Sequence, residues 1–222
     1  MTDIQHRLRQ DIVSGAFAFG SRLPIEELSA RYGCSHMPIR EALRILHGEG
    51  LVVIEPNRGA RVRPLYRGFI EDVFDVRAAI ETMLARRAAL RRSSDHLRQM
   101  REAAAELEAS IASGARDAVP LANQRFHAAI NDAAGNPGAL AIVENHWVLL
   151  AVLLNRFGSD DETRFPRVID EHRQLISAID RQDAYAAQML MAAHIEKGKA
   201  NLLERAALAF NHDTIPEPES CT

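Results

Sequence analysis

Residues 22–62 read RLPIEELSARYGCSHMPIREALRILHGEGLVVIEPNRGARV, and this stretch decides the fold of the first part of the chain. Its apolar spacing predicts a short helix over residues 25–32 and a second helix over residues 36–47. A tight turn that ends at Ser35 lies between them, and the Ser35 hydroxyl can cap the second helix by accepting a first-turn amide. Two β-prone segments then follow around a Pro/Asn/Gly turn, which is typical of a hairpin.

The second helix of this stretch has an apolar face and a basic face. The apolar residues at helical spacing are Ile39, Ala42, Leu43 and Leu46. Arg40 and Arg44, four residues apart, project from another side, and the hairpin adds Arg58 and Arg61. A helix fits the major groove, where arginine donates two hydrogen bonds to guanine, and a basic hairpin can lie along phosphates. With a first helix near residues 4–12, the pattern predicts a DNA-binding winged helix-turn-helix; from spacing alone, arginines that merely solvate a small helical domain stay an alternative.

Length and charge divide the chain into two parts. At 222 residues it exceeds one small domain, and we expect a DNA-binding domain at 1–64, an all-helical effector-binding and dimerisation domain at 67–209, and a flexible tail at 210–222. The formal net charge is −3, but residues 1–64 carry nine arginines against seven acidic residues, a net of +2 that leaves −5 for the remainder. Any contact with nucleic acid is therefore expected within residues 1–64.

The sequence favours a cytoplasmic protein without membrane contact. Its start lacks the apolar stretch of a secretory signal, and no uninterrupted apolar run approaches the roughly 20 residues that span a bilayer. Cys34 and Cys221 lie far apart without the spacing of a metal motif. We therefore predict neither a disulfide nor a zinc ligand nor a nucleophile from them.

Read residue by residue, this first part resembles the signature of the GntR family of bacterial transcription regulators. The most specific matches are PIREAL at 38–43, GLV at 50–52 and the wing glycine Gly59. The resemblance implies that Arg40 reads bases, that Arg44 and Arg31 support it, and that Gly59 lets the wing backbone approach the minor groove. Where the family commonly has arginine after the serine of the turn, this chain has His36, which predicts a departure from the family's usual operator. Because such regulators pair symmetrically, we expect a homodimer on a two-fold symmetric DNA operator.

From Phe69 to about Ala209 only helical patterns follow, and this part resembles the FCD ligand-binding domain of the FadR-like branch, a bundle of six or seven helices. In that branch, an Asp and a His four residues apart and two His on later helices often hold a metal. The corresponding residues here are Asn123, His127, His172 and His194. The resemblance thus implies a divalent ion of the zinc, nickel or manganese class.

The spacing of these four residues also indicates that they point inward. Asn123 and His127 share one helix face, and His172 and His194 each fall in an apolar stripe. Any one of these histidines alone reads most simply as a core residue with a hydrogen-bond partner. Three on separate stripes favour a shared ion. His146 also falls in an apolar stripe without a role in the family motif, so periodicity alone predicts too many ligands.

The departure at Asn123 affects both the metal and the effector. An amide oxygen is a weaker ligand than a carboxylate and leaves the ion its full +2 charge, which favours an anionic effector. Arg77, in step with the apolar residues of its helix, resembles the family's carboxylate-binding arginine, and Arg156 is a second candidate. The alternative for Arg77 is a buried salt bridge with a neighbouring acid.

The sequence therefore predicts a mainly α transcription regulator, a repressor or an activator, whose operator affinity depends on a small carboxylate bound near a metal. Two alternatives remain: a metal-independent DNA-binding regulator with structural histidines, and a helical metalloenzyme. Against an enzyme, the sequence offers no nucleophile paired with a base, no Glu recognisable as a general base beside the ligand positions, and no phosphate loop.

Overall fold

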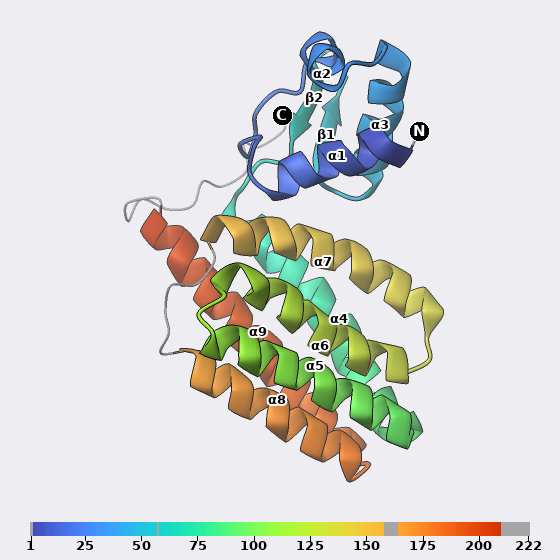
Figure 1. Cartoon of the computed structure of the whole chain (residues 1–222), viewed down its shortest axis with the longest axis vertical. Helices are drawn as coiled ribbons and strands as arrows, with labels where there is room; N and C mark the ends of the chain where they lie inside the picture. Colours follow the sequence, from blue (N-terminus) through green and yellow to red (C-terminus); the bar gives the residue numbers. More distant parts are fainter. Residues whose placement is uncertain (1, 57, 158–163, 210–222) are drawn as a thin grey trace.

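The computed structural model describes residues 2–56, 58–157 and 164–209 (Figure 1). The described part is mainly α-helical and contains one two-stranded sheet, which confirms the predicted fold class. The predicted tail at 210–222 lies outside the described residues, as does Asn57 in the hairpin turn.

The first part of the chain is a winged helix-turn-helix. Its helices are α1 (Thr2–Val13), α2 (Ile25–Tyr32) and α3 (His36–Gly48), and its hairpin consists of β1 (Val52–Glu55) and β2 (Gly59–Val62). The strands are antiparallel, with Val52 opposite Val62. The two predicted helices of the motif thus begin at the expected residues, and the second continues one residue beyond its predicted end.

Local backbone chemistry explains the turn between α2 and α3. Gly33 ends α2 with a φ of 67°, a left-handed conformation that glycine adopts without steric cost. Ser35 occupies the N-cap position of α3, but its hydroxyl makes no hydrogen bond to the helix, so the predicted side-chain cap is wrong. The apolar face of α3 is buried as predicted, and this packing holds the helix in place.

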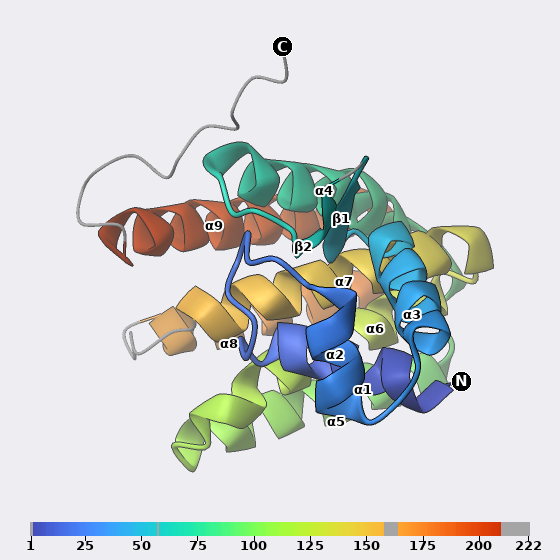
Figure 2. The same ribbon diagram turned by 90° about the horizontal axis from the view of Figure 1, so that it is seen from above.

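The second part is a bundle of six α-helices within the described residues. They are α4 (Arg67–Arg91), α5 (Ser94–Ala112), α6 (Val119–Ala133), α7 (Pro137–Phe157), α8 (Phe165–Asp180) and α9 (Ala184–Ala209), with the short 3-10 helix η1 (Arg116–Ala118) before α6. In both views α4 and α9 run side by side, and they are the most extensively packed helix pair (Figures 1 and 2). Gly198 permits this approach, because a Cβ there would lie 3.3 Å from the Phe74 ring.

Helix α7 of the bundle also packs against the winged helix-turn-helix. It packs against α4, α6 and α9 and also against α1, where Asn155 Nδ2 donates to the Val13 carbonyl over 3.0 Å. With 21 residues and a mean hydropathy of 1.6 in its most apolar window, α7 has the length and composition of a membrane span. Its apolar run is broken by Glu144, Asn145 and His146, it packs against four other helices, and 28% of that window is buried.

Candidate DNA-binding surface and effector cavity

The outward face of α3 carries the predicted DNA-reading residues. Ser35, His36, Arg40 and Arg44 are all exposed. Arg40 makes no ion pair or hydrogen bond with the described residues, so its guanidinium is available for bases. Arg44 differs, because its Nη2 lies 2.7 Å from Glu41 Oε1 in an exposed pair. Contact of Arg44 with a phosphate or a base would therefore compete with a weak surface salt bridge.

Arg31 lies on α2 and is tied to α1. Its Nη2 lies 2.9 Å from Asp11 Oδ2, and the Tyr32 hydroxyl donates to the same oxygen over 2.7 Å. Burial and this hydrogen bond raise the pKa of Tyr32 to about 12. The supporting role that the sequence assigns to Arg31 is thus accompanied by a structural one, the attachment of α2 to α1.

The wing residues differ in how exposed they are. Arg58 and Gly59 are exposed, and Gly59 has a φ of 86°, with no atom within 4 Å of where a Cβ would stand. The wing backbone is accordingly open at this point. Arg61 is half-buried, and its Nη2 lies 3.1 Å from Glu55 Oε2 on the paired strand. Arg61 therefore stabilises the hairpin, whereas Arg58 is directed to solvent.

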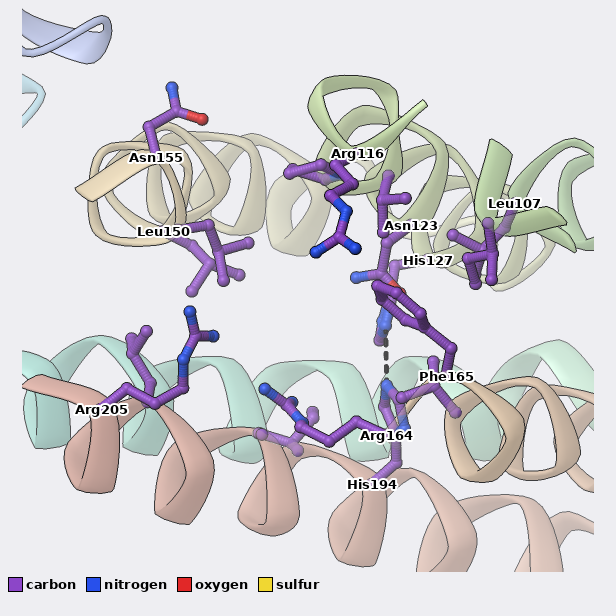
Figure 3. A pocket seen from close by; sticks show the side chains of 18 of the residues that line it. Leu107, Arg116, Asn123, His127, Leu150, Asn155, Arg164, Phe165, His194 and Arg205 are labelled. Atoms are coloured by element: carbon purple, nitrogen blue, oxygen red, sulfur yellow. Dashed lines mark hydrogen bonds between the residues drawn. The ribbon is translucent and has the colours of Figure 1, made fainter. Parts of the chain in front are cut away.

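Three histidines from three helices meet inside the bundle. His127 of α6, His172 of α8 and His194 of α9 each offer a ring nitrogen, and these nitrogens all lie within 4.8 Å of one another. The Nε2 atoms of His127 and His194 are 3.2 Å apart (Figure 3). His127 and His172 are buried, and the His194 side chain is 11% exposed. We call these three residues the histidine cluster.

Two carboxylates orient this cluster. Glu81 Oε2 lies 2.7 Å from His127 Nδ1, and Glu171 Oε2 lies 2.8 Å from His194 Nδ1. A carboxylate at Nδ1 accepts the proton there and leaves the lone pair on Nε2. Two lone pairs that face each other over 3.2 Å repel, and a cation between them removes the repulsion. The arrangement thus fits a metal ion ligated by the Nε2 atoms.

His172 gives independent support for such an ion. Both of its ring nitrogens are buried and have no hydrogen-bond partner. Its ring stacks on Phe126, with 3.8 Å between the ring centroids. A buried polar group without a partner costs about 1–3 kcal/mol, and coordination of a metal would satisfy one of these nitrogens.

The charge states of the cluster suit metal binding. Burial lowers the pKa of His127 to about 4 although Glu81 opposes the shift, and burial lowers the pKa of His172 far below its usual value. For Glu81, burial favours the neutral acid, but Arg77 and His127 hold its pKa at about 2. At neutral pH the two imidazoles are therefore uncharged, which is the state that ligates metals.

Arg77 forms the buried salt bridge that the sequence left open as an alternative. Its Nε lies 2.6 Å from Glu81 Oε1, and the two side chains are 4% and 0% exposed. Its guanidinium also lies over the Trp147 ring, 4.2 Å from the centroid. Arg77 lines the cavity described next, but Glu81 already neutralises its charge.

The histidine cluster borders a cavity of about 380 Å³, a volume that suits a small ligand. His127, His194 and Asn123 are in its wall, and Arg156 lines it as well. Arg116, Arg164 and Arg205 also line it and extend toward the same space (Figure 3). His172 is not among the lining residues, so it contacts the other histidines from behind the wall.

Comparison with known families decides the identity of both parts of the chain. Residues 1–62 match the model of the bacterial regulatory proteins of the gntR family, and residues 72–197 match the FCD domain. The chain belongs to the GntR family and carries an FCD domain. The resemblance predicted from the sequence is thereby confirmed.

Relatives of this GntR-family chain are transcription regulators. It is 30% identical over 217 residues to the galactonate operon transcriptional repressor of Escherichia coli K12, covering 89% of this chain and 94% of that protein. It is 28% identical over 191 residues to the transcriptional repressor RspR of the same organism, covering 86% and 83% of the two chains. The expectation of a DNA-binding regulator rather than an enzyme is therefore confirmed.

Solved structures agree on the fold. Escherichia coli McbR/YncC superposes with a TM-score of 0.76 at 20% identity, covering 92% of this chain and 97% of that one. A putative GntR regulator from Rhodococcus sp. RHA1 gives a TM-score of 0.71 at 24% identity, covering 91% and 97%. At these identities the likeness concerns the fold alone.

Two residues that contact the histidine cluster were not identified from the sequence. No Glu was recognised there as a general base beside the ligand positions, and Glu81 and Glu171, which both contact cluster imidazoles, were not predicted. Glu81 also pairs with Arg77, and Glu171 with Lys197, so these carboxylates position ligands. Glu81 stands four residues after Arg77 on one helix face, a spacing that could have revealed it. His146 is only half-buried, and its Nδ1 lies 3.0 Å from the Ile142 carbonyl, outside the cluster.

Proposed function

We propose that this GntR-family regulator is a cytoplasmic homodimer whose affinity for a two-fold symmetric operator is controlled by a small carboxylate bound beside a divalent metal. In this proposal residues 1–64 bind DNA, and residues 67–209 bind the effector and form the dimer. The observation that carries it is the histidine cluster, two members of which, His127 and His194, lie in the wall of a ligand-sized cavity. Native mass spectrometry of the purified protein tests it, because one spectrum reveals the dimer, the metal and any retained metabolite.

In the DNA-binding part, Arg40 is the proposed base reader and Arg58 the proposed phosphate contact. Both are exposed and carry no ion pair with the described residues. Arg40 lies on α3, and Arg58 lies next to Gly59 in the wing. Recognition helices use exposed arginines for guanine, whereas wings follow the backbone. The net charge of +2 on residues 1–64 supports the same assignment.

Arg40→Ala should weaken binding to the operator by about 1–3 kcal/mol while hardly changing binding to unrelated DNA, because only base contacts depend on sequence. Fluorescence anisotropy at one fixed salt concentration measures both affinities, on a duplex selected by the protein from a random library and on a scrambled duplex. Arg181→Ala, which removes an exposed arginine from the bundle, is the charge-matched control. Equal losses on both duplexes would assign Arg40 to phosphate contact.

In the effector part, His127, His172 and His194 would hold the metal, with Asn123 nearby in the cavity wall. A divalent ion of the zinc, nickel or manganese class would act there as a Lewis acid that coordinates the carboxylate of the effector. The protein supplies oriented neutral imidazoles, and Glu81 and Glu171 fix the orientation of two of them. Glu81 also pairs with Arg77, and Glu171 pairs with Lys197. Since both carboxylates already have cationic partners, the anionic ligand of the metal ion would be the carboxylate of the effector.

Asn123→Asp should tighten metal binding at least about tenfold, or 1.4 kcal/mol, because a carboxylate compensates the ion's charge and an amide does not. Competition with a chromophoric zinc chelator measures the change. The matched control is Gln124→Glu, which makes the same charge change one residue away and outside the cavity wall. If both variants bind zinc equally, Asn123 does not contact the ion.

A further inference from the structure

Met37 is a large apolar side chain that lies in water on the DNA-reading helix. It is the second residue of α3, and it is 72% exposed. Among the large apolar side chains described within residues 1–64, only Ile54 is also exposed, at 42%. The buried face of α3 packs without Met37, so the interior of the domain does not explain a methionine here. Single exposed apolar residues are common on protein surfaces, and the meaning of this one depends on its neighbours.

Met37 shares a helix face with the proposed base reader. Arg40 follows it by three residues and Arg44 by seven, spacings that place the three side chains on one side of a helix. All three side chains are exposed. In helix-turn-helix proteins, the first residues of the recognition helix are the ones that reach base edges in the major groove. Met37 therefore lies where side chains meet bases, about one turn before Arg40.

The chemistry of methionine limits what Met37 can recognise in the groove. Its side chain carries no hydrogen-bond donor and only a weak sulfur acceptor, so it makes no strong bond with a phosphate or with the polar edges of the bases. The apolar group that B-DNA presents in the major groove is the C5-methyl of thymine. An unbranched, flexible side chain can adapt its shape to cover such a methyl group. Thymine is therefore the base that suits Met37.

We infer that Met37 is a specificity-determining residue that contacts the C5-methyl of a thymine in each half of the operator. The inference rests on the proposed function, because it uses the face of α3 that is assigned above to operator DNA. It adds a second base to the guanine that Arg40 would read. Three residues rise about 4.5 Å along a helix, and successive phosphates of one strand are about 3.4 Å apart along the DNA axis. The thymine is therefore expected within one or two base pairs of that guanine.

Replacement of thymine by deoxyuridine tests the contact, because it removes the C5-methyl and leaves the base pair otherwise unchanged. The duplex is an operator that the full chain selects from a random library, and each thymine is replaced in turn. Fluorescence anisotropy at one salt concentration should show about a fourfold loss of affinity at one thymine of each half-site, as expected for one buried methyl-sized group. Unchanged affinity at every thymine would overturn the inference.

Met37→Ala should abolish the difference in affinity between the thymine and deoxyuridine duplexes, because the short alanine side chain does not reach the methyl group. Alanine has the highest helix propensity, so α3 should stay folded, which circular dichroism checks. Met37→Leu keeps an apolar contact and should retain much of the difference. The control is Ile54→Ala, which removes the other exposed apolar side chain of this part and should retain all of it. A difference that survives in Met37→Ala would contradict the role of Met37.

The same titrations separate this inference from the proposed function. If Arg40→Ala loses the preference for operator but deoxyuridine has no effect on the wild type, the proposed operator face stands and Met37 does not read thymine. If Met37→Ala weakens binding to operator and scrambled duplexes equally, with no effect of the methyl group, Met37 contacts the DNA backbone and the inference is wrong. A chain that selects no operator would overturn both.

Discussion

Glu81→Ala is expected to lower the free energy of unfolding by about 3–5 kcal/mol, because it leaves the Arg77 guanidinium buried without its charge partner. The Arg77 and Glu81 side chains are 4% and 0% exposed, so the pair is largely shielded from bulk water. The same substitution removes the acceptor of His127 Nδ1. Urea denaturation of the metal-free protein, monitored by circular dichroism in the presence of a chelator, measures the decrease in the free energy of unfolding.

The matched control for this prediction is Glu108→Ala. Glu108 Oε2 pairs with Arg173 Nη2 over 2.7 Å on the surface, where the Arg173 side chain is 63% exposed. Removing an exposed pair costs less than about 1 kcal/mol. Glu81→Gln should fall between the two, because it keeps an oxygen for His127 but not the charge for Arg77. Similar losses for Glu81→Ala and Glu108→Ala would show that the inner pair is hydrated.

His172→Ala is expected to weaken metal binding at least about a hundredfold, or 2.8 kcal/mol, because it removes one of three proposed ligands. His172 has no hydrogen-bond partner among the described residues, so little besides its stacking on Phe126 competes with this role. Zinc competition and elemental analysis after gentle purification measure the effect. The metal-free variant should unfold cooperatively in urea, which shows that the bundle is intact.

His146→Ala is the control for the metal prediction. His146 is half-buried on α7 and lies outside the histidine cluster, so its removal should leave metal content unchanged. If wild-type protein binds no metal after incubation with zinc, manganese or nickel, the histidines are core residues. The metal-independent regulator would then be the correct alternative.

The DNA-binding part could be predicted closely because its signals are local. The helical spacing, the glycine at the end of α2 and the turn of the wing all act within a few residues of one another. What escaped prediction there depends on tertiary contact. Arg31 meets Asp11 across 20 residues of sequence, and Arg61 meets Glu55 across the hairpin.

For the bundle, the sequence predicted which helix faces point inward but not which side chains contact one another. Periodicity placed His127, His172 and His194 inward, and they do meet. It could not show that Glu171, next to His172 in sequence, contacts His194 on another helix. Arg116, Arg164 and Arg205, which also line the cavity, share no periodic signal, because they come from a short 3-10 helix, the residue before α8 and the last turns of α9.

The structure also suggests a route between cavity and DNA-binding part. The end of α7 carries Leu150 and Asn155 in the cavity wall, and Asn155 donates to the Val13 carbonyl of α1. Leu149, next to Leu150 on α7, lies 3.5 Å from the position of a Cβ at Gly50, just before the hairpin. A shift of α7 on effector binding would therefore change its contacts with α1 and with the start of the wing hairpin at the same time.

The central claim is that carboxylate binding in the bundle changes operator affinity, and reciprocal titration tests it most directly. Small mono-, di- and tricarboxylates and sugar acids are titrated into zinc-loaded protein by calorimetry, with and without saturating operator. Linkage predicts that an acid that changes operator affinity tenfold, about 1.4 kcal/mol, has its own affinity changed by the same factor when operator is bound. Tight carboxylate binding with unchanged operator affinity would contradict the account, because no differential interaction would then couple the two sites.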